Sequence, residues 1–369
     1  MKDSPPNLSE LRPAAEQSTR LKQYCDSGQL FRDRYRVMRL LGRGGFGVTY
    51  LAQDTLLPVS PLCVIKQLSP KMNNPMSLER ARIRFKREAK ILSKLGSHSQ
   101  IPMLLDYFTV KGEFYLVQEY IQGETISKEV RRSGPQNEIK VKQFLQEILP
   151  VIKYVHRHRV IHRDIKPPNI IRCRNDGRLV LIDFGAVREY LANQADDPLQ
   201  KNPTNQFVGT MGFAPPEQLA LRPTYASDIY ALGVTCLFML TGRSPVEFES
   251  DPETGEILWR SYVQVSSHFA AVLNKMLKFS TEERYQKIDE VKRTLDLEPY
   301  FNSLADCMNT PSGVERSSPP EDIVIPMNGY LTPIQREAAA IRKWRSRRLL
   351  KEQGRRRRGI LTTSKAFPL

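Results

Sequence analysis

The sequence predicts an α+β fold, in which strand-like segments and one helix precede a second, buried helix. Three features of the chain support this prediction. Strand-like segments from Tyr35 to Leu41 and from Val48 to Ala52 flank a glycine-rich turn. Apolar residues then recur at helical spacing between Leu78 and Leu95. The longest apolar stretch, Ala231 to Leu240, is too short to cross a bilayer, and we interpret it as a buried helix.

A second hairpin is predicted within residues 162–185, which read HRDIKPPNIIRCRNDGRLVLIDFG. Ile170 to Arg174 and Leu179 to Ile182 are strand-like, and Asn175-Asp176-Gly177 between them carries the Asp-Gly signal of a tight turn. The hairpin would bring three oxygen-bearing side chains together: Asp164, Asn169 and Asp183.

These side chains have the chemistry of a phosphoryl-transfer site. Mg²⁺ prefers oxygen ligands and keeps several waters, so the carboxylate of Asp183 and the amide oxygen of Asn169 suit it. Asp164 is left as a base that orients an attacking hydroxyl and accepts its proton. Lys166 can neutralise the charge of a γ-phosphate.

The motif HRDxKxxN, followed by an apolar strand that ends in DFG, resembles the catalytic and magnesium loops of eukaryotic-type protein kinases. The resemblance covers about Tyr35 to Leu297, and the phrases GRGGFGVTYLAQD, CVIKQL and GFAPPEQL are most similar to Hanks-type serine/threonine kinases of cyanobacteria. It implies a two-lobed fold with ATP in the cleft. The N-lobe, about 35–118, would hold a small antiparallel sheet and the helix termed αC in that family, and a mostly helical C-lobe would span about 122–300.

A glycine-rich loop follows the first strand-like segment and has the G-x-G-x-x-G spacing. A dinucleotide-binding fold would need a helix after the glycines, whereas here a strand-like segment follows. A backbone without Cβ atoms can lie close over phosphates, as the kinase loop does over ATP. The residues expected to contact ATP here are Leu41, Gly42, Gly44, Gly45, Phe46, Gly47 and Thr49.

Lys66 ends an apolar run and resembles the kinase lysine that pairs with the α- and β-phosphates, although an exposed lysine at a strand end is an alternative. Glu88 falls inside the apolar stripe of the predicted helix. A carboxylate that faces a core is costly without a cation, so we predict an ion pair between Lys66 and Glu88.

Gln118 to Gly123 is similar to the hinge that joins the two kinase lobes. The resemblance implies that backbone groups of Glu119 and Ile121 bind adenine, that Gln118 is the gatekeeper, and that Glu124 lies near the ribose.

The segment GTMGFAPPEQL resembles the substrate-facing loop and the APE motif, with Pro215 in place of the usual alanine. The family pattern implies that Thr210 contacts Asp164 and Lys166, as in the serine/threonine branch. It further implies a pair between Glu217 and Arg284 and a bracing role for Asp228, while His162 holds the backbone of the catalytic loop. Arg163 would receive a phosphate on Thr204, unless Thr204 is an unmodified loop residue.

The bulk composition agrees with one kinase domain plus extensions. The chain has 369 residues, with hydrophobic and charged fractions typical of a soluble globular protein. We find no membrane span or secretory signal, so a cytoplasmic location is expected. The five cysteines have no C-x-x-C pair, which argues against a zinc site or a disulfide framework.

The terminal segments are predicted to lie outside the kinase domain of residues 35–300. Residues 1–34 form a polar leader, and 301–330 contain a Pro/Ser-rich linker. Most of the net charge of +16 lies in 331–369, which has twelve basic residues and two acidic ones. We expect a solvated tail; binding to an acidic partner, an anionic membrane surface or nucleic acid is the alternative. Acceptor residues after its arginine block suggest a third hypothesis, an autophosphorylation or autoinhibitory segment: Thr362, Thr363 and Ser364.

The resemblance implies transfer of the γ-phosphoryl group of ATP to serine or threonine of protein substrates, with Mg²⁺ or alternatively Mn²⁺. A pseudokinase scaffold would need the loss of Lys66, Asp164 or Asp183, and all three are present. A small-molecule phosphotransferase would not need the activation segment of residues 183–217. The tail alone supports a nucleic-acid-binding protein, and nothing in the sequence indicates an oligomeric state.

Overall fold

A computed structural model of the chain describes residues 20–44, 47–68, 75–96, 98–189 and 209–298. The chain divides into two units, 1–307 and 308–369, and every described residue belongs to the first. The predicted linker and basic tail therefore lie outside the described residues. So do several predicted site residues: Gly45, Phe46 and Thr204.

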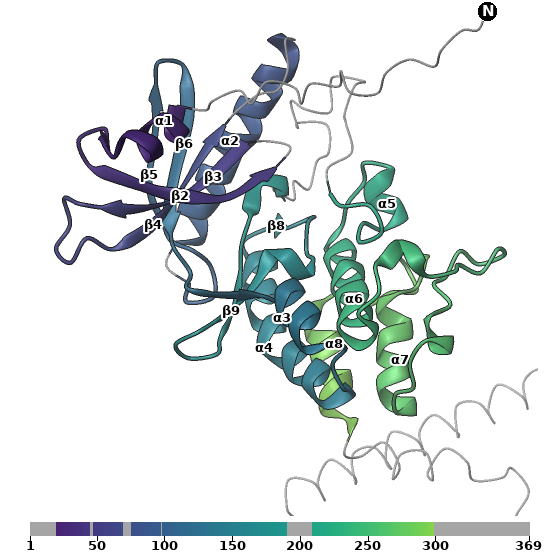
Figure 1. Ribbon diagram of the computed structural model, residues 1–369. Coiled ribbons are helices and arrows are strands. Elements are labelled where there is room, and N and C mark those ends of the chain that lie inside the picture. The colour runs from purple at the N-terminus through teal and green to yellow at the C-terminus, as the bar shows by residue number, and fades with distance from the viewer. Residues whose placement is uncertain (1–19, 45–46, 69–74, 97, 190–208, 299–369) are drawn as a thin grey trace, which may run out of the picture. The chain divides into compact units, whose positions relative to one another are not determined.

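The N-terminal part of the described chain is a six-stranded antiparallel sheet with the order β1-β2-β3-β4-β6-β5 (Figure 1). Its strands are β1 (Leu30–Phe31), β2 (Tyr35–Gly44), β3 (Gly47–Asp54), β4 (Leu62–Leu68), β5 (Leu104–Val110) and β6 (Glu113–Glu119). The predicted sheet is confirmed, and its strands extend beyond the apolar cores that indicated them.

Helix α2 (Pro75–Leu95) confirms the helix predicted from the stripe between Leu78 and Leu95. Its apolar side chains Phe85 and Leu92 are buried. They belong to one hydrophobic cluster that continues through helix α4 (Glu138–Arg157) to α6 (Tyr225–Thr241). The core therefore connects the sheet-bearing lobe with the helical lobe.

The other apolar cluster of the N-lobe is covered by a helix that sequence analysis missed, α1 (Arg20–Ser27). Leu21 of this helix and Phe31 of β1 are almost completely buried, and the Phe31 ring lies 4.8 Å from that of Tyr115. Residues 20–34 of the predicted leader, which include α1 and β1, thus pack against the sheet of this lobe. An eight-residue helix with one buried side chain has too few apolar positions for a periodic signal.

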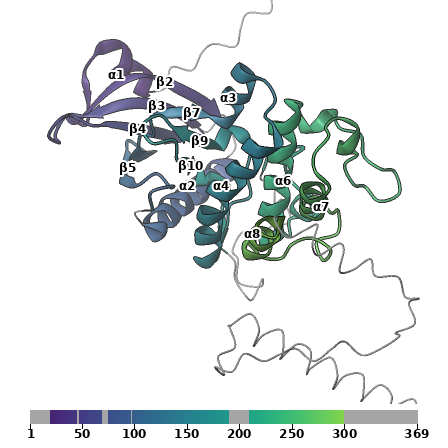
Figure 2. The ribbon, with the colours of Figure 1, turned by 90° about the horizontal axis from the view of Figure 1, so that it is seen from below.

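The C-terminal part is mostly helical, as predicted, and α4, α6, α7 (Ser267–Met276) and α8 (Ile288–Asp296) pack together (Figure 2). Helix α6 is apolar on nearly all sides and lies in the middle of the lobe, as expected of a wholly buried helix. Gly242 ends it at φ 68°, a left-handed conformation that favours glycine. Shorter helices are α3 (Ile126–Ser133) and α5 (Pro216–Leu219).

Two small sheets lie between the sheet-bearing lobe and the helices. One has the order β10-β9-β7 and the other pairs β11 with β8. The predicted hairpin is confirmed as β9 (Ile170–Cys173) and β10 (Leu179–Leu181), joined by a turn in which Gly177 has φ 75°. The remaining strands are β7 (Gly123–Thr125), β8 (Val160–Ile161) and β11 (Arg188–Glu189).

Within the described ranges, no helix combines the length and the apolar character needed to span a membrane.

Leu21 provides a test of whether α1 is part of the lobe. Replacing Leu21 with Ala removes a buried side chain and leaves a cavity, so the free energy of unfolding should fall by about 2–5 kcal/mol. Leu56→Ala is the matched control, because that side chain is 69% exposed and should change stability by less than about 0.5 kcal/mol. Urea unfolding of both variants measures the difference; equal stabilities would show that α1 is dispensable.

Candidate active site

Lys66 on β4 and Glu88 on α2 form the predicted ion pair. The Lys66 Nζ lies 2.9 Å from both carboxylate oxygens of Glu88 and 3.0 Å from Asp183 Oδ1. Glu88 is 2% exposed, so the cation is what makes a carboxylate tolerable at this depth. Burial alone would lower the pKa of Lys66, but the charges of Asp183 and Glu88 outweigh it, and the pKa is raised.

The two carboxylates respond differently to this shared cation. The charge of Lys66 holds the pKa of Asp183 down at about 2, so Asp183 is ionised at neutral pH. Burial raises the pKa of Glu88, and Lys66 offsets only part of that effect. Asp183 also lies in the left-handed region at φ 65°, and its Oδ1 accepts a hydrogen bond from the Gly185 N–H at 3.4 Å.

Gly185 follows this turn at a place where a side chain would intrude on the charges. An added Cβ would lie 3.3 Å from Asp183 Oδ1, from Glu88 Oε2 and from Lys66 Nζ. A substituted residue would therefore press on all three charged groups at once. Glycine suits this position of the DFG motif because three charged groups surround it closely.

Asp164, Lys166, Asn169 and Thr210 meet in a second cluster. Asn169 donates from Nδ2 to the backbone oxygen and to Oδ2 of Asp164, both at 2.9 Å. Lys166 Nζ lies 2.8 Å from Asp164 Oδ2 and 2.7 Å from Thr210 Oγ1. The Thr210 hydroxyl donates to Asp164 Oδ1 at 2.8 Å. The contacts expected for Thr210 are therefore present, and both oxygens of Asp164 are held in place.

The two clusters are joined through the backbone of the hairpin. The Ile182 N–H, one residue before Asp183, donates to the Asn169 carbonyl at 2.9 Å. The hairpin therefore sets the spacing of Asn169 and Asp183, as the sequence predicted.

Asp228 of α6 braces the loop that carries Asp164. Its two carboxylate oxygens accept hydrogen bonds from the backbone N–H groups of His162 and Arg163, at 2.9 and 2.8 Å. His156 Nε2 lies 2.8 Å from the same carboxylate, which is fully buried. Burial would raise the pKa of Asp228, but these hydrogen bonds and the two nearby histidines lower it overall. The predicted bracing contact is present, and Arg163 is held at φ 69°.

Gln218 is a further support that sequence analysis missed. Its Nε2 donates to the Arg163 carbonyl at 2.7 Å, and the residue is almost completely buried. The bond links the loop before Asp164 to α5. In the sequence, the only feature that could have indicated this role is its position directly after Glu217 in the APE-like segment.

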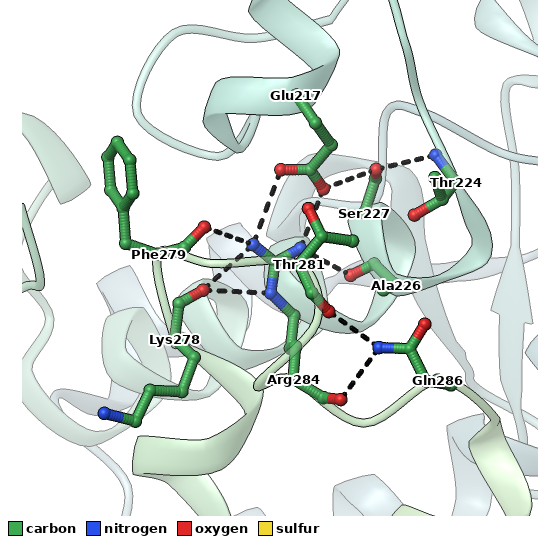
Figure 3. A network of polar contacts seen from close by, with 9 residues as sticks. All are labelled: Glu217, Thr224, Ala226, Ser227, Lys278, Phe279, Thr281, Arg284 and Gln286. Carbon is green, nitrogen blue, oxygen red and sulfur yellow. Dashed lines mark hydrogen bonds and ion pairs between the residues drawn. The ribbon is translucent and has the colours of Figure 1, made fainter.

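The buried pair of Glu217 and Arg284 anchors the end of the activation segment (Figure 3). Arg284 Nη1 lies 2.7 Å from Glu217 Oε1, and the arginine side chain is fully buried. Its remaining N–H groups donate to the carbonyls of Ala226, Lys278 and Phe279. The predicted pair is therefore present. Because every side of the guanidinium is bonded, another side chain could not replace Arg284 without leaving some of these groups unbonded.

The glycine-rich loop is described on both sides of its tip. A Cβ on Gly47 would collide with the carbonyl oxygen of Gln67 on the neighbouring strand, whereas one on Gly42 would meet open space. Gly47 is therefore required by the approach of β3 to β4, a reason that differs from the phosphate contact proposed from the sequence. Leu41 is partly exposed and Thr49 half-buried next to this turn.

The predicted hinge follows β6. The Glu119 N–H donates to the Met103 carbonyl at 2.9 Å, so this N–H is already bonded within the protein. Ile121 is buried in a small apolar cluster with Cys173 and Val180. Glu124, expected near the ribose, is paired with Arg132 at 3.0 Å.

Comparison with known proteins assigns the fold and the site to a family. The protein kinase domain matches residues 35–301. Because this match covers most of the chain, the chain belongs to the protein kinase family.

Several similar relatives within that family are cyanobacterial. Serine/threonine-protein kinase B of Synechocystis sp. is 47% identical over 298 residues, which are 79% of this chain and 51% of that protein. Serine/threonine-protein kinase PknA of Nostoc sp. is 46% identical over 73% of this chain and 48% of its own length. Serine/threonine-protein kinase C of Synechocystis sp. is 43% identical over 72% of this chain and 50% of its own length. The chain thus spans about half the length of these relatives.

Arg284 offers a test of the anchoring pair. Arg284→Ala leaves Glu217 without its buried cation and three carbonyls without donors, so the free energy of unfolding should fall by about 3–5 kcal/mol. Arg243→Ala is the control, because its contact with Glu247 is half-exposed and worth about 0–1 kcal/mol. Urea unfolding compares the two. A loss below about 1 kcal/mol for Arg284→Ala would mean that the pair does not hold the segment.

Proposed function

We propose that the chain is a serine/threonine protein kinase that transfers the γ-phosphoryl group of ATP, with Mg²⁺, to hydroxyl groups of protein substrates. The observation that carries the proposal is the contact of Thr210 and Lys166 with opposite oxygens of Asp164. It puts a carboxylate, an ammonium group and the substrate-facing loop in one place. The names of the cyanobacterial relatives support the same reading.

In the proposed reaction, bound ATP supplies the phosphoryl group and ADP is the leaving group. Asp164 orients the substrate hydroxyl and accepts its proton as the new oxygen–phosphorus bond forms and the bond to the β-phosphate oxygen breaks. Lys166 is close enough to Asp164 to offset negative charge at the transferred group. Lys66, held by Glu88, is the cation for the α- and β-phosphates.

The residues present fit a magnesium ion. Asn169 uses its Nδ2 for Asp164, which leaves its amide oxygen for a ligand role, and Asp183 is an ionised carboxylate. In the described part of the chain, no three His, Cys, Asp or Glu side chains gather into a metal-binding group. The ion would therefore rely on Asp183, Asn169, water and nucleotide phosphates, which is a typical Mg²⁺ environment. Mn²⁺ has similar ligand preferences.

Two other readings are less well supported. A pseudokinase scaffold would be expected to lack one of the charged groups, yet Lys66, Asp164 and Asp183 are all present. Lys66 contacts Asp183, and Asp164 contacts Lys166. A small-molecule phosphotransferase has no need for a segment anchored by Glu217 and Arg284, which supports a platform for a peptide.

Asp164→Asn tests the proposed base. The rate of phosphoryl transfer from labelled ATP to a protein substrate should fall roughly 10²- to 10⁴-fold, because general base catalysis is lost, while nucleotide affinity stays within about threefold. Asp176→Asn, an exposed carboxylate in the β9–β10 turn, is the matched control and should keep full activity. If the wild-type chain transfers no phosphate, or if Asp164→Asn keeps its rate, the proposed function is wrong.

Regulation by phosphorylation is part of the proposal. The Arg163 carbonyl accepts a hydrogen bond from Gln218, which directly follows the activation segment. A phosphothreonine at position 204 could form charge-assisted hydrogen bonds with the Arg163 side chain. Incubation with ATP and Mg²⁺, followed by mass spectrometry, should show phosphate on Thr204, and Thr204→Ala should lower activity severalfold. The same spectra test the tail residues Thr362, Thr363 and Ser364. If Thr204 is unmodified and Thr204→Ala is fully active, regulation through Arg163 is discarded.

A further inference from the structure

A cavity of about 620 Å³ is lined by residues of α3, α4, β7 and β9 and of the turn after β9, and it includes Gly123 and Glu124 next to the predicted hinge. These four elements are labelled near one another in Figure 2. The cavity is lined by five lysine or arginine residues and only two glutamates. None of the residues that line it belongs to either of the two clusters around Asp183 and Asp164. The cavity therefore has a positive lining that neither of these two clusters uses.

Two of the arginines form ion pairs with glutamates in or next to the cavity lining. Arg172 on β9 donates to Glu129 of α3 and to Glu147 of α4, each at 3.0 Å. Arg132 pairs with Glu124 at 3.0 Å. These contacts neutralise both lining glutamates and fix the three surrounding elements relative to one another.

The other three cations have no such contact. Among the described residues, the side chains of Lys128, Lys140 and Arg174 make no ion pair or hydrogen bond. They come from three elements: α3, α4 and the turn after β9. The cavity thus carries about three uncompensated positive charges on a preformed wall.

The two lysines also stand where helix electrostatics disfavour a cation. Lys128 and Lys140 are each the third residue of their helices, and their backbone N–H groups bond to the caps Thr125 and Asn137. The first turn of a helix bears a partial positive charge and favours anions. A lysine there adds to that potential, so helix stability does not account for these residues, whereas anion binding does.

We propose that this cavity is a docking site for an acidic peptide segment of a partner protein. Its volume holds several side chains, and three cations on separate elements match a run of carboxylates better than one small anion. Nucleic acid fits less well, because no aromatic side chain is among the described lining residues to stack on a base.

The test is direct binding to the full chain, without ATP or turnover, so that its outcome is independent of the proposed function. A fluorescein-labelled peptide with five consecutive glutamates is titrated and followed by anisotropy, beside the same peptide with glutamines. The glutamate peptide should bind and the glutamine peptide should not. Affinity should fall as salt is raised, because exposed charges are screened.

Charge-reversal variants locate the binding. Lys128→Glu combined with Lys140→Glu should weaken binding roughly tenfold, through lost attraction and new repulsion. The control is Arg131→Glu combined with Lys292→Glu, two exposed helix positions that do not line the cavity. Both double variants leave the basic residues 331–369 unchanged, so their difference excludes the tail as its cause.

A photoreactive version of the glutamate peptide should crosslink to α3, α4 or the turn after β9. Equal affinity of the two double variants, or crosslinks confined to other surfaces, would overturn the proposal. So would a single-stranded oligonucleotide of equal charge that binds the cavity more tightly than the peptide.

Discussion

The contact of Lys66 with both Glu88 and Asp183 is the constraint on which the candidate site depends. It joins three elements that are distant in sequence: a strand of the sheet, the helix α2 and the loop after β10. Glu88 cannot remain charged at its depth without the lysine, and the lysine cannot reach both carboxylates unless the two lobes lie close together. The buried charge of Glu88 is therefore stable only when the two lobes are close enough for Lys66 to contact both carboxylates. The hydrophobic cluster that runs from α2 to α6 satisfies that requirement.

In the helical lobe, buried charged side chains hold backbone groups in place. Asp228 holds two successive N–H groups of the loop before Asp164, and Arg284 holds three carbonyls as well as Glu217. Irregular segments cannot satisfy their polar groups by a helix or a sheet ladder, so other groups must do so. Here the partners are Asp228 of α6 and Arg284 in the chain before α8, and both side chains are almost completely buried. The loops of the site are therefore ordered by the core beneath them.

Sequence reasoning predicted the parts of this arrangement that leave a local signal. The stripe of α2 with Glu88 inside it, the Asp-Gly turn between β9 and β10, and the long apolar run of α6 each follow from spacing within one element. The elements that sequence analysis missed leave no such local signal. β7 has three residues, α1 has one buried side chain, and β5 begins with a register shift in its pairing to β6, so none shows a clear period. Gly47 was predicted for its type, but the reason for it lies in the approach of Gln67 from another strand.

The positive cavity was beyond sequence analysis for a related reason. Lys128, Lys140 and Arg174 are ordinary surface residues in the sequence, and only the topology places them on one lining. That topology is tight, because a Cβ on Gly123 would collide with the carbonyl oxygen of Arg172, so β7 and β9 can pair this closely only with glycine there. The side chain of the same Arg172 ties α3 and α4 to β9. The three residues 120–122 separate β6 of the sheet-bearing lobe from β7 of the cavity wall. A ligand in the cavity would therefore bind next to the segment that leads out of the N-lobe.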